Sequence, residues 1–312
     1  MMTMNWIPAL ALLLPLTHAF ADTAEPAPLD ADVAPVLACM ANNLPSALRV
    51  QQIELVATAR DGYRRSMNGR LFVMREDDGS SDTLRAMLRI DAPPAHAGTA
   101  YLTRGELTRP PGENYVYLPA LRRVRQVTGS FSDGPLLASD FSYREFRMML
   151  GVFDDGEIVH EGTDTIDGRD TTRLRFMPPA DLVTPYGSVH VWVDATSCLP
   201  LKAEFMQADT VRKRFSVDVN SLARSGDQQY ATVSRMDDLA EGSHTVIRVL
   251  GVRQGLNVRD TDRLAAGRSG LQLGRQALLA VLGALACGSP VSGLNTRISA
   301  WWVCRPLLPL SG

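Results

Sequence analysis

Residues 115–146 read YVYLPALRRVRQVTGSFSDGPLLASDFSYREF, and the chain is organised around this stretch. It opens with two short apolar and basic runs, residues 115–118 and 121–127, separated by a Pro119–Ala120 step. A strand interior does not tolerate proline, so the pattern predicts a hairpin that turns at this step.

A loop rich in Gly, Ser and Asp follows the hairpin, and Ser142 then opens a second segment. Apolar side chains recur at helical spacing through residues 143–150, and Gly151 supplies a stop, so we predict a short helix here. Asp140 lies just ahead of it and is expected to have a structural role, either capping the helix or pairing with a hairpin arginine.

This stretch resembles the signature of the LolA-like outer membrane lipoprotein-sorting protein family of Gram-negative periplasmic proteins. The resemblance lies in the LPxxRRxR hairpin and the SDFSY helix entry. The chain departs from the pattern at Ala138, where Gly is expected, and at Glu145–Phe146, where Asp–Leu is more usual. More weakly, the similarity extends over roughly residues 30–256.

The resemblance implies a carrier for the lipid moiety of a lipoprotein or for a free lipid. Its partners would then be acyl chains, with an inner-membrane transporter and an outer-membrane acceptor. The motif residues that it offers for ligand contact are Tyr115, Tyr117, Leu118, Pro119, Arg122, Arg123, Arg125, Ser139, Asp140, Phe141, Tyr143 and Phe146.

The N-terminal residues 1–21 have the pattern of a cleaved secretory signal. Residues 6–16 form a short apolar run, and residues 19–21 give the small-x-small cleavage site. A membrane anchor is the competing interpretation, but the run is well short of the ~20 apolar residues that a spanning helix needs. We therefore expect a periplasmic protein with a flexible segment at residues 22–29.

Composition narrows the class of protein. With 312 residues and 45% hydrophobic content the chain can bury a substantial core. A net charge of -2 argues against general nucleic-acid binding, which needs a strongly basic domain.

Alternating apolar and polar residues predict strands, which recur at residues 53–57, 172–176, 189–193, 215–219 and 246–252. Asp-Gly turn signals between strands predict a large antiparallel meander. Because only residues 31–42 and 142–150 read as helices, the sheet must curl and be covered by them. The predicted fold is mainly β (α+β), a large curved antiparallel sheet forming a half-open barrel closed by one or two helices, as the LolA/LolB-like resemblance also implies.

A curled sheet leaves an apolar concave cavity wherever its helices do not fill it. Such a cavity accepts acyl chains, at ~0.8 kcal/mol per buried CH₂. For any single apolar residue, ordinary core remains the better interpretation.

Arg122, Arg123 and Arg125 have two interpretations. Guanidinium groups clustered on a hairpin can bind phosphate head groups or an acidic partner surface. Alternatively, they protect a solvated strand edge from pairing with another edge.

The positions of the cysteines permit a disulfide but do not establish one. Cys39, in the helix at residues 31–42, and Cys198, in a predicted turn, are candidates to pair in an oxidising compartment. One buried and one unpaired cysteine is the alternative. The other two, Cys287 and Cys304, lie in the tail, and the chain has no CxxC or Cys/His cluster, which disfavours a metal site or a cofactor.

Catalytic patterns are missing from the sequence. His96, His160, His190 and His244 are spread over separate segments, with no nucleophile, zinc or nucleotide motif near them. We expect a protein that is not an enzyme.

The chain is thus expected to hold one LolA-like domain at residues 30–256, followed by an atypical tail at residues 257–312 that is disordered or loosely helical. Two functions follow. The first is a carrier that binds an acyl moiety in the concave cavity and delivers it toward the outer membrane. The alternative is a non-catalytic periplasmic sensor or interaction module that regulates an envelope-stress or transport partner.

Overall fold

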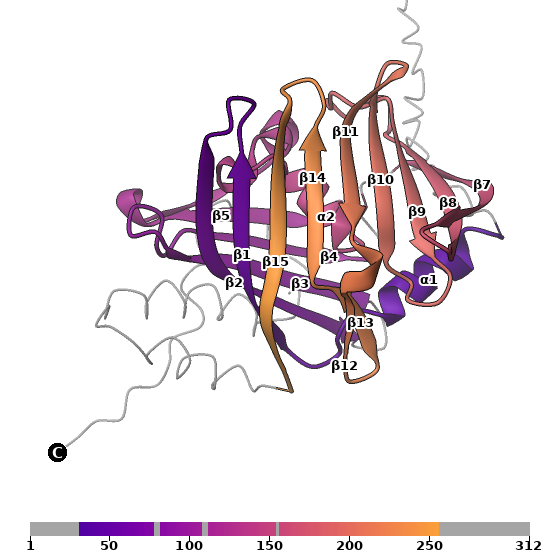
Figure 1. The fold of residues 1–312 in the computed structure, drawn as a ribbon, viewed down its shortest axis with the longest axis horizontal. Helices are drawn as coiled ribbons and strands as arrows, with labels where there is room; N and C mark the ends of the chain where they lie inside the picture. Colours follow the sequence, from indigo (N-terminus) through magenta and orange to yellow (C-terminus); the bar gives the residue numbers. More distant parts are fainter. Residues whose placement is uncertain (1–30, 78–81, 108–111, 154–155, 256–312) are drawn as a thin grey trace, which may run out of the picture.

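The computed structural model describes residues 31–77, 82–107, 112–153 and 156–255. The expected signal peptide, the segment at residues 22–29 and the tail at residues 257–312 lie outside them. The described residues form a 13-stranded antiparallel sheet, a separate two-stranded hairpin and two α-helices (Figure 1).

The first strand, β1, and the last strand, β15, pair with each other in the middle of the sheet. In spatial order the strands are β6 (Arg123–Gln126), β5 (Glu113–Leu118), β4 (Ala100–Glu106), β3 (Asp82–Ala92), β2 (Arg64–Asp77), β1 (Arg49–Thr58), β15 (Ser243–Gln254), β14 (Val233–Asp238), β11 (Thr210–Val217), β10 (Pro200–Gln207), β9 (Ser188–Asp194), β8 (Arg169–Met177) and β7 (Glu157–Ile166). The hairpin of β12 (Leu222–Ser225) and β13 (Gln228–Ala231) stands apart.

The two helices match the predicted ones. The first, α1 (Ala34–Asn42), starts three residues later than expected, with a proline in its first turn. The second, α2 (Tyr143–Met149), begins after its N-cap Ser142. Four short 3-10 turns complete the described helical structure: η1 (Pro119–Leu121), η2 (Gly129–Asp133), η3 (Leu136–Ala138) and η4 (Val219–Ser221).

Curvature of the sheet follows from what α2 touches. Phe146 of α2 packs edge-on against Tyr101 of β4, while Glu145 of α2 is ion-paired with Lys213 of β11. Five strands lie between β4 and β11 in the sheet order, so both can reach one short helix only if the sheet curls around it. In Figure 1, α2 is seen between β14 and β11, behind these front strands. The predicted curved antiparallel sheet covered by helices is confirmed.

The main core lies on the concave face. Alternate residues of the strands, among them Leu55, Leu88, Val191 and Phe205, are fully buried there together with Phe146. This alternation is the period-two pattern that predicted the strands.

The opposite face of β1 to β5 carries a second, smaller apolar cluster. Val50, Phe72, Met87, Leu102 and Tyr115 are successive cross-strand partners in one row. This half of the sheet is therefore apolar on both faces, a burial pattern that strict alternation would not predict.

The hairpin at residues 115–127 is confirmed. η1 holds the Pro119 turn between β5 and β6, and Arg122 closes it with a left-handed backbone (φ 47°). A disulfide joins Cys39 of α1 to Cys198, in the turn between β9 and β10, with their Cα atoms 5.4 Å apart.

Candidate functional site: α2, its anchor and the cavity beneath it

The start of α2 is fixed by a capping box. Ser142 Oγ accepts a hydrogen bond from the Glu145 backbone N–H at 3.1 Å, and Glu145 Oε2 accepts one from the Ser142 backbone N–H at 2.7 Å. The two residues satisfy each other's backbone donors, which is what the S-x-x-E spacing provides. The helix needs this support because seven residues are too few for a stable helix in isolation.

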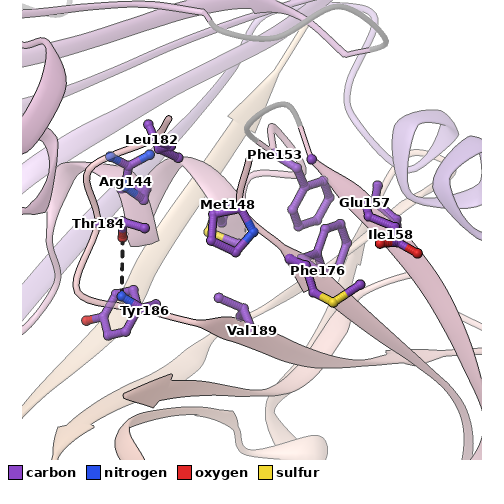
Figure 2. A pocket seen from close by; sticks show the side chains of 13 residues that line it. Arg144, Met148, Phe153, Glu157, Ile158, Phe176, Leu182, Thr184, Tyr186 and Val189 are labelled. Carbon is purple, nitrogen blue, oxygen red and sulfur yellow. Dashed lines mark hydrogen bonds between the residues drawn. The ribbon is translucent and has the colours of Figure 1, made fainter. Parts of the chain in front are cut away.

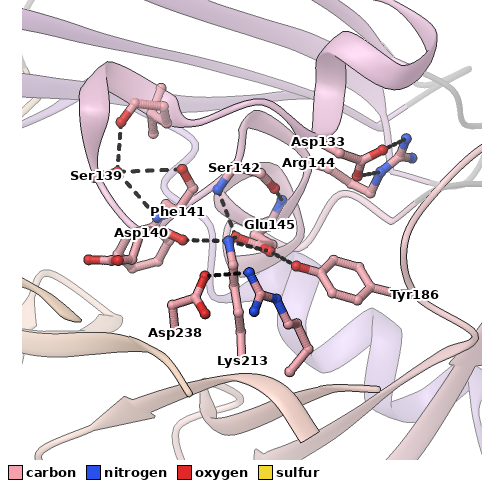
Figure 3. A network of polar contacts seen from close by, with 12 residues as sticks. Asp133, Ser139, Asp140, Phe141, Ser142, Arg144, Glu145, Tyr186, Lys213 and Asp238 are labelled. Carbon is pink, nitrogen blue, oxygen red and sulfur yellow. Dashed lines mark hydrogen bonds and ion pairs between the residues drawn. The ribbon is translucent and has the colours of Figure 1, made fainter. Parts of the chain in front are cut away.

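The carboxylate of Glu145 is fully buried and compensated by the surrounding sheet. Lys213 Nζ lies 3.1 Å from Glu145 Oε1, and the Tyr186 hydroxyl donates to the same oxygen (Figure 3). A buried charge is costly unless it is paired and hydrogen-bonded, and both conditions are met here. Burial, together with the adjacent Glu145 carboxylate, raises the pKa of Tyr186 well above its ordinary value, so this tyrosine stays a donor.

Asp140 ties the segment before α2 to the middle of the sheet. Its carboxylate accepts hydrogen bonds from Ser243 Oγ and, at 2.5 Å, from Thr245 Oγ1, both on β15. Its backbone oxygen accepts one from Lys213 Nζ at 2.7 Å. The structural role expected of Asp140 is confirmed, but its partners differ from the two that were considered, because Ser142 caps α2 and the Asp140 carboxylate bonds to hydroxyls of β15. We call Asp140, Ser142, Glu145, Tyr186 and Lys213 the anchor network.

A second polar contact holds α2 from the other side. Arg144 Nε donates to Asp133 Oδ1 of η2 at 2.7 Å, and Thr184 Oγ1 donates to the same oxygen at 3.5 Å. Asp133 thus joins α2 to the loop that precedes β9.

Between these contacts the underside of α2 is apolar. Tyr143 packs against Tyr101 in a tilted arrangement with ring centroids 4.9 Å apart, and Phe146 packs edge-on against both Tyr101 and Phe141. Phe141 in turn meets Phe215 of β11 at 6.2 Å. The helix therefore fills the concave face as a plug with an apolar inner surface and polar fastenings.

A small cavity remains beside α2. Its volume is about 40 Å³, and Met148, Phe153, Phe176, Leu182 and Val189 contribute to its lining (Figure 2). Pockets for drug-sized ligands occupy roughly 300–1,000 Å³, so an acyl chain does not fit while α2 is docked. The expected apolar concave surface is present, and α2 occupies it.

The predicted motif residues separate into three places. Asp140 belongs to the anchor network, Tyr143 and Phe146 lie on α2, and Ser139 and Phe141 lie in the segment just before the helix. Leu118 packs partly buried against the main core, with Pro119 beside it at the turn, while Tyr115 and Tyr117 face away in the second apolar cluster. Arg122, Arg123 and Arg125 are exposed at the edge strand β6 and its turn. None of the twelve lines the cavity of Figure 2.

Glu145, Lys213 and Tyr186 had no predicted role. The S-x-x-E pattern could have identified Glu145 as part of a capping box. Lys213 and Tyr186 lie 68 and 41 residues away from it in sequence, so only the folded sheet brings them to the same carboxylate.

On the outward face of the sheet, Ser188, His190 and Glu161 lie in a row that resembles a nucleophile, a base and an acid. Ser188 Oγ lies 3.4 Å from His190 Nε2, and His190 Nδ1 lies 2.8 Å from Glu161 Oε2. Glu161 also pairs with Arg173 at 3.1 Å and with Arg175 at 3.0 Å. Because two arginines already neutralise this carboxylate, it is poorly suited to activate a histidine, and we interpret the group as a surface ion-pair network.

The described residues contain no group of three or more His, Cys, Asp or Glu side chains arranged to hold a metal ion. Over the same part of the chain, neither helix has the length and apolar character that crossing a bilayer requires.

Solved structures share this fold. A domain described as an outer membrane lipoprotein-sorting protein domain, from Vibrio parahaemolyticus, is 21% identical, with a TM-score of 0.62 over 75% of this chain and 97% of that one. A DUF1329 family protein from Desulfovibrio piger is 22% identical, with a TM-score of 0.63 over 74% and 96%. A LolA superfamily protein from Nitrosomonas europaea is 16% identical, with a TM-score of 0.52 over 70% and 92%.

One family model matches residues 82–262 and is described as "Uncharacterized protein"-like. No curated protein matches the chain.

Proposed function

The chain belongs to the "Uncharacterized protein"-like family, whose model matches residues 82–262, and the chain itself has a LolA-like fold. From that premise we propose that this protein is a periplasmic carrier. Its cargo would be a lipid or the acyl moiety of a lipoprotein, bound on the concave face and delivered toward the outer membrane. The observation that carries this proposal is the way α2 is held, with an apolar underside and polar fastenings.

Because α2 is held to the sheet by polar contacts, it can be displaced from the concave face. The hydrogen bonds of Asp133, Asp140 and Glu145 can be exchanged for hydrogen bonds to water, and because each involves a charged group, opening costs roughly 1.5–3 kcal/mol net per bond. The apolar contacts of Phe146 and Met148 can be replaced by contacts with an acyl chain. Burial of a 16-carbon chain contributes on the order of 12 kcal/mol at ~0.8 kcal/mol per CH₂, which is enough to displace a helix of two turns.

The surroundings of the cavity indicate the direction of opening. Met148 of α2 faces Phe176 of β8 and Val189 of β9 across it. Outward movement of α2 would join this cavity to the apolar concave surface of the sheet and lengthen it into a groove. Most of the lining is apolar, which suits an acyl chain, and Arg144 and Glu157 are the charged residues among those that line the cavity.

Two further observations support the compartment and the cargo. A disulfide between Cys39 and Cys198 suits an oxidising compartment such as the periplasm. The similar Vibrio parahaemolyticus domain is described as lipoprotein-sorting, which supports an acylated cargo.

The first test is native mass spectrometry of the full chain, expressed with its own N-terminal residues and purified gently from a periplasm. We expect a reproducible added mass that fragments to a lipid or an acylated peptide. An empty protein that also takes up no fluorescent fatty acyl probe would overturn the carrier proposal and favour the sensor or interaction module.

A matched pair of variants locates the site. Val189→Phe places a larger side chain into the cavity and is expected to reduce acyl-probe uptake at least tenfold. Ser188→Phe adds a similar bulk to the same strand on its opposite face and should leave uptake unchanged. Equal uptake by both variants would place the cargo elsewhere.

A further inference from the structure

A charged and apolar surface lies at one edge of the sheet. We call it the docking edge: Leu121, Arg122, Arg123, Val124, Arg125 and Phe131. The first five lie on η1, its turn and the edge strand β6, and Phe131 lies on the following turn η2. All six side chains are exposed.

The exposed apolar side chains here are large. Phe131 is 77% exposed, Leu121 51% and Val124 42%. Single exposed apolar residues are common, but three large ones within eleven positions of the chain, in the same segment as three arginines, indicate an interaction surface.

The arginines of the docking edge differ from arginines elsewhere in the described chain. Arg173 and Arg175 pair with Glu161, and Arg214 pairs with Glu204 at 3.0 Å. No ion pair joins Arg122, Arg123 or Arg125 to a carboxylate of the described residues. Residues 119–132 contain three arginines and no acidic residue, so this segment is locally positive.

The docking edge is connected to the cavity. Asp133, two residues after Phe131, accepts the hydrogen bonds from Arg144 of α2 and from Thr184. Thr184 and its neighbour Leu182 line the cavity, and Val183 between them is 71% exposed. A surface that seats Phe131 and Val183 would thus lie at the contact that fastens α2.

From these observations we propose that the docking edge binds the surface of an anionic phospholipid membrane. Guanidinium groups bind phosphate oxygens in a bidentate way, and apolar side chains beside them enter the boundary between head groups and acyl chains. An acidic protein surface would satisfy the arginines, but it would leave Phe131 without an apolar environment. This proposal adds membrane docking to the carrier function, and it is tested without cargo so that either proposal can fail alone.

The test is binding of the full chain to vesicles, measured by flotation. We compare vesicles of phosphatidylcholine with vesicles that contain one third phosphatidylglycerol, at low and high salt. We expect binding only to the anionic vesicles and weaker binding at high salt, because salt screens exposed charges. Absence of binding to anionic vesicles would overturn the proposal and leave a protein partner as the alternative.

Variants assign the binding to the docking edge. The triple variant Arg122→Gln, Arg123→Gln, Arg125→Gln is expected to bind about a hundredfold more weakly, since each basic residue near an anionic surface contributes roughly fivefold. Phe131→Ser is expected to weaken binding about tenfold with no change in charge. A control triple, Arg173→Gln, Arg214→Gln, Arg235→Gln, removes the same charge from the outward face and should stay within about threefold of the wild type.

Equal losses in the two triple variants would show that only net charge matters and would also overturn the proposal. Uptake of a soluble acyl probe, measured without vesicles, should remain at the wild-type level in the docking-edge triple. A loss of vesicle binding with intact probe uptake therefore separates docking from cargo binding. Circular dichroism melting checks that each variant is folded.

Discussion

Lys213 Nζ lies 3.1 Å from Glu145 Oε1, and the pair joins β11 to the first turn of α2 inside the curved sheet. Glu145 has no exposed surface and the Lys213 side chain is 13% exposed. The contact therefore decides whether a short helix with little stability of its own stays docked on the concave face.

Removing one partner of this pair should destabilise the docked state. Lys213→Met leaves the Glu145 carboxylate buried without its cation, and a cost of about 3 kcal/mol in unfolding free energy is expected. The double variant Lys213→Met, Glu145→Gln removes both charges and should recover more than half of that loss. Urea unfolding of the wild type, the double variant and the two single variants Lys213→Met and Glu145→Gln completes the cycle, and additive losses in the double variant would contradict a direct pairing.

Tyr186 should make stability depend on pH in the alkaline range. Its pKa is raised in the folded protein, so its contribution is complete below the ordinary value of about 10 and is lost as pH rises further. Tyr186→Phe also removes a donor to Glu145 and should cost about 2 kcal/mol at neutral pH. The stability difference between wild type and variant should shrink above pH 10, and a difference that stays constant to pH 11 would contradict this.

Asp194 should make the stability of the fold depend on pH in the acidic range. Burial by itself opposes ionisation of this carboxyl, but hydrogen bonds from Arg169 at 2.7 Å and from the Ser197 backbone at 2.6 Å keep its pKa below the ordinary value. A depressed pKa contributes stability above about pH 4 that is lost as pH falls through the folded value. Asp194→Asn should cost about 3 kcal/mol at pH 7 and much less at pH 2.5, as urea unfolding at the two pH values would show.

The disulfide should stabilise the packing of α1 against the turn between β9 and β10. It closes a loop between residues 159 positions apart in sequence, and removing a native disulfide typically costs 2–5 kcal/mol. Cys39→Ser and Cys198→Ser should each lower the melting temperature, and a reducing agent should lower that of the wild type to the same value. A reducing agent that lowers the melting temperature of the serine variants equally would show that another effect is being measured.

The sequence predicted the strands and helices better than it predicted the contacts between them. Period-two alternation around Leu55, Val191 and Phe215 identified strands because each strand has one face in the concave core. The proline turn of the hairpin and the cap at Ser142 were predictable because both are local properties of the backbone. The partners of Asp140 were not predictable, because Ser243 and Thr245 are more than a hundred residues away in sequence.

The sequence by itself determined the local structure of this protein: strands from side-chain alternation, turns from Gly and Pro, and a short helix from the helical spacing of apolar residues between Ser142 and Gly151. These follow from sterics and hydrogen bonding between near neighbours. Only the tertiary structure decided that α2 fills the concave face, that Glu145 meets Lys213 and Tyr186, and that Arg122, Arg123 and Arg125 lie at an exposed edge. The reason is that sheet curvature and strand order bring together side chains whose separation along the chain carries no sequence signal.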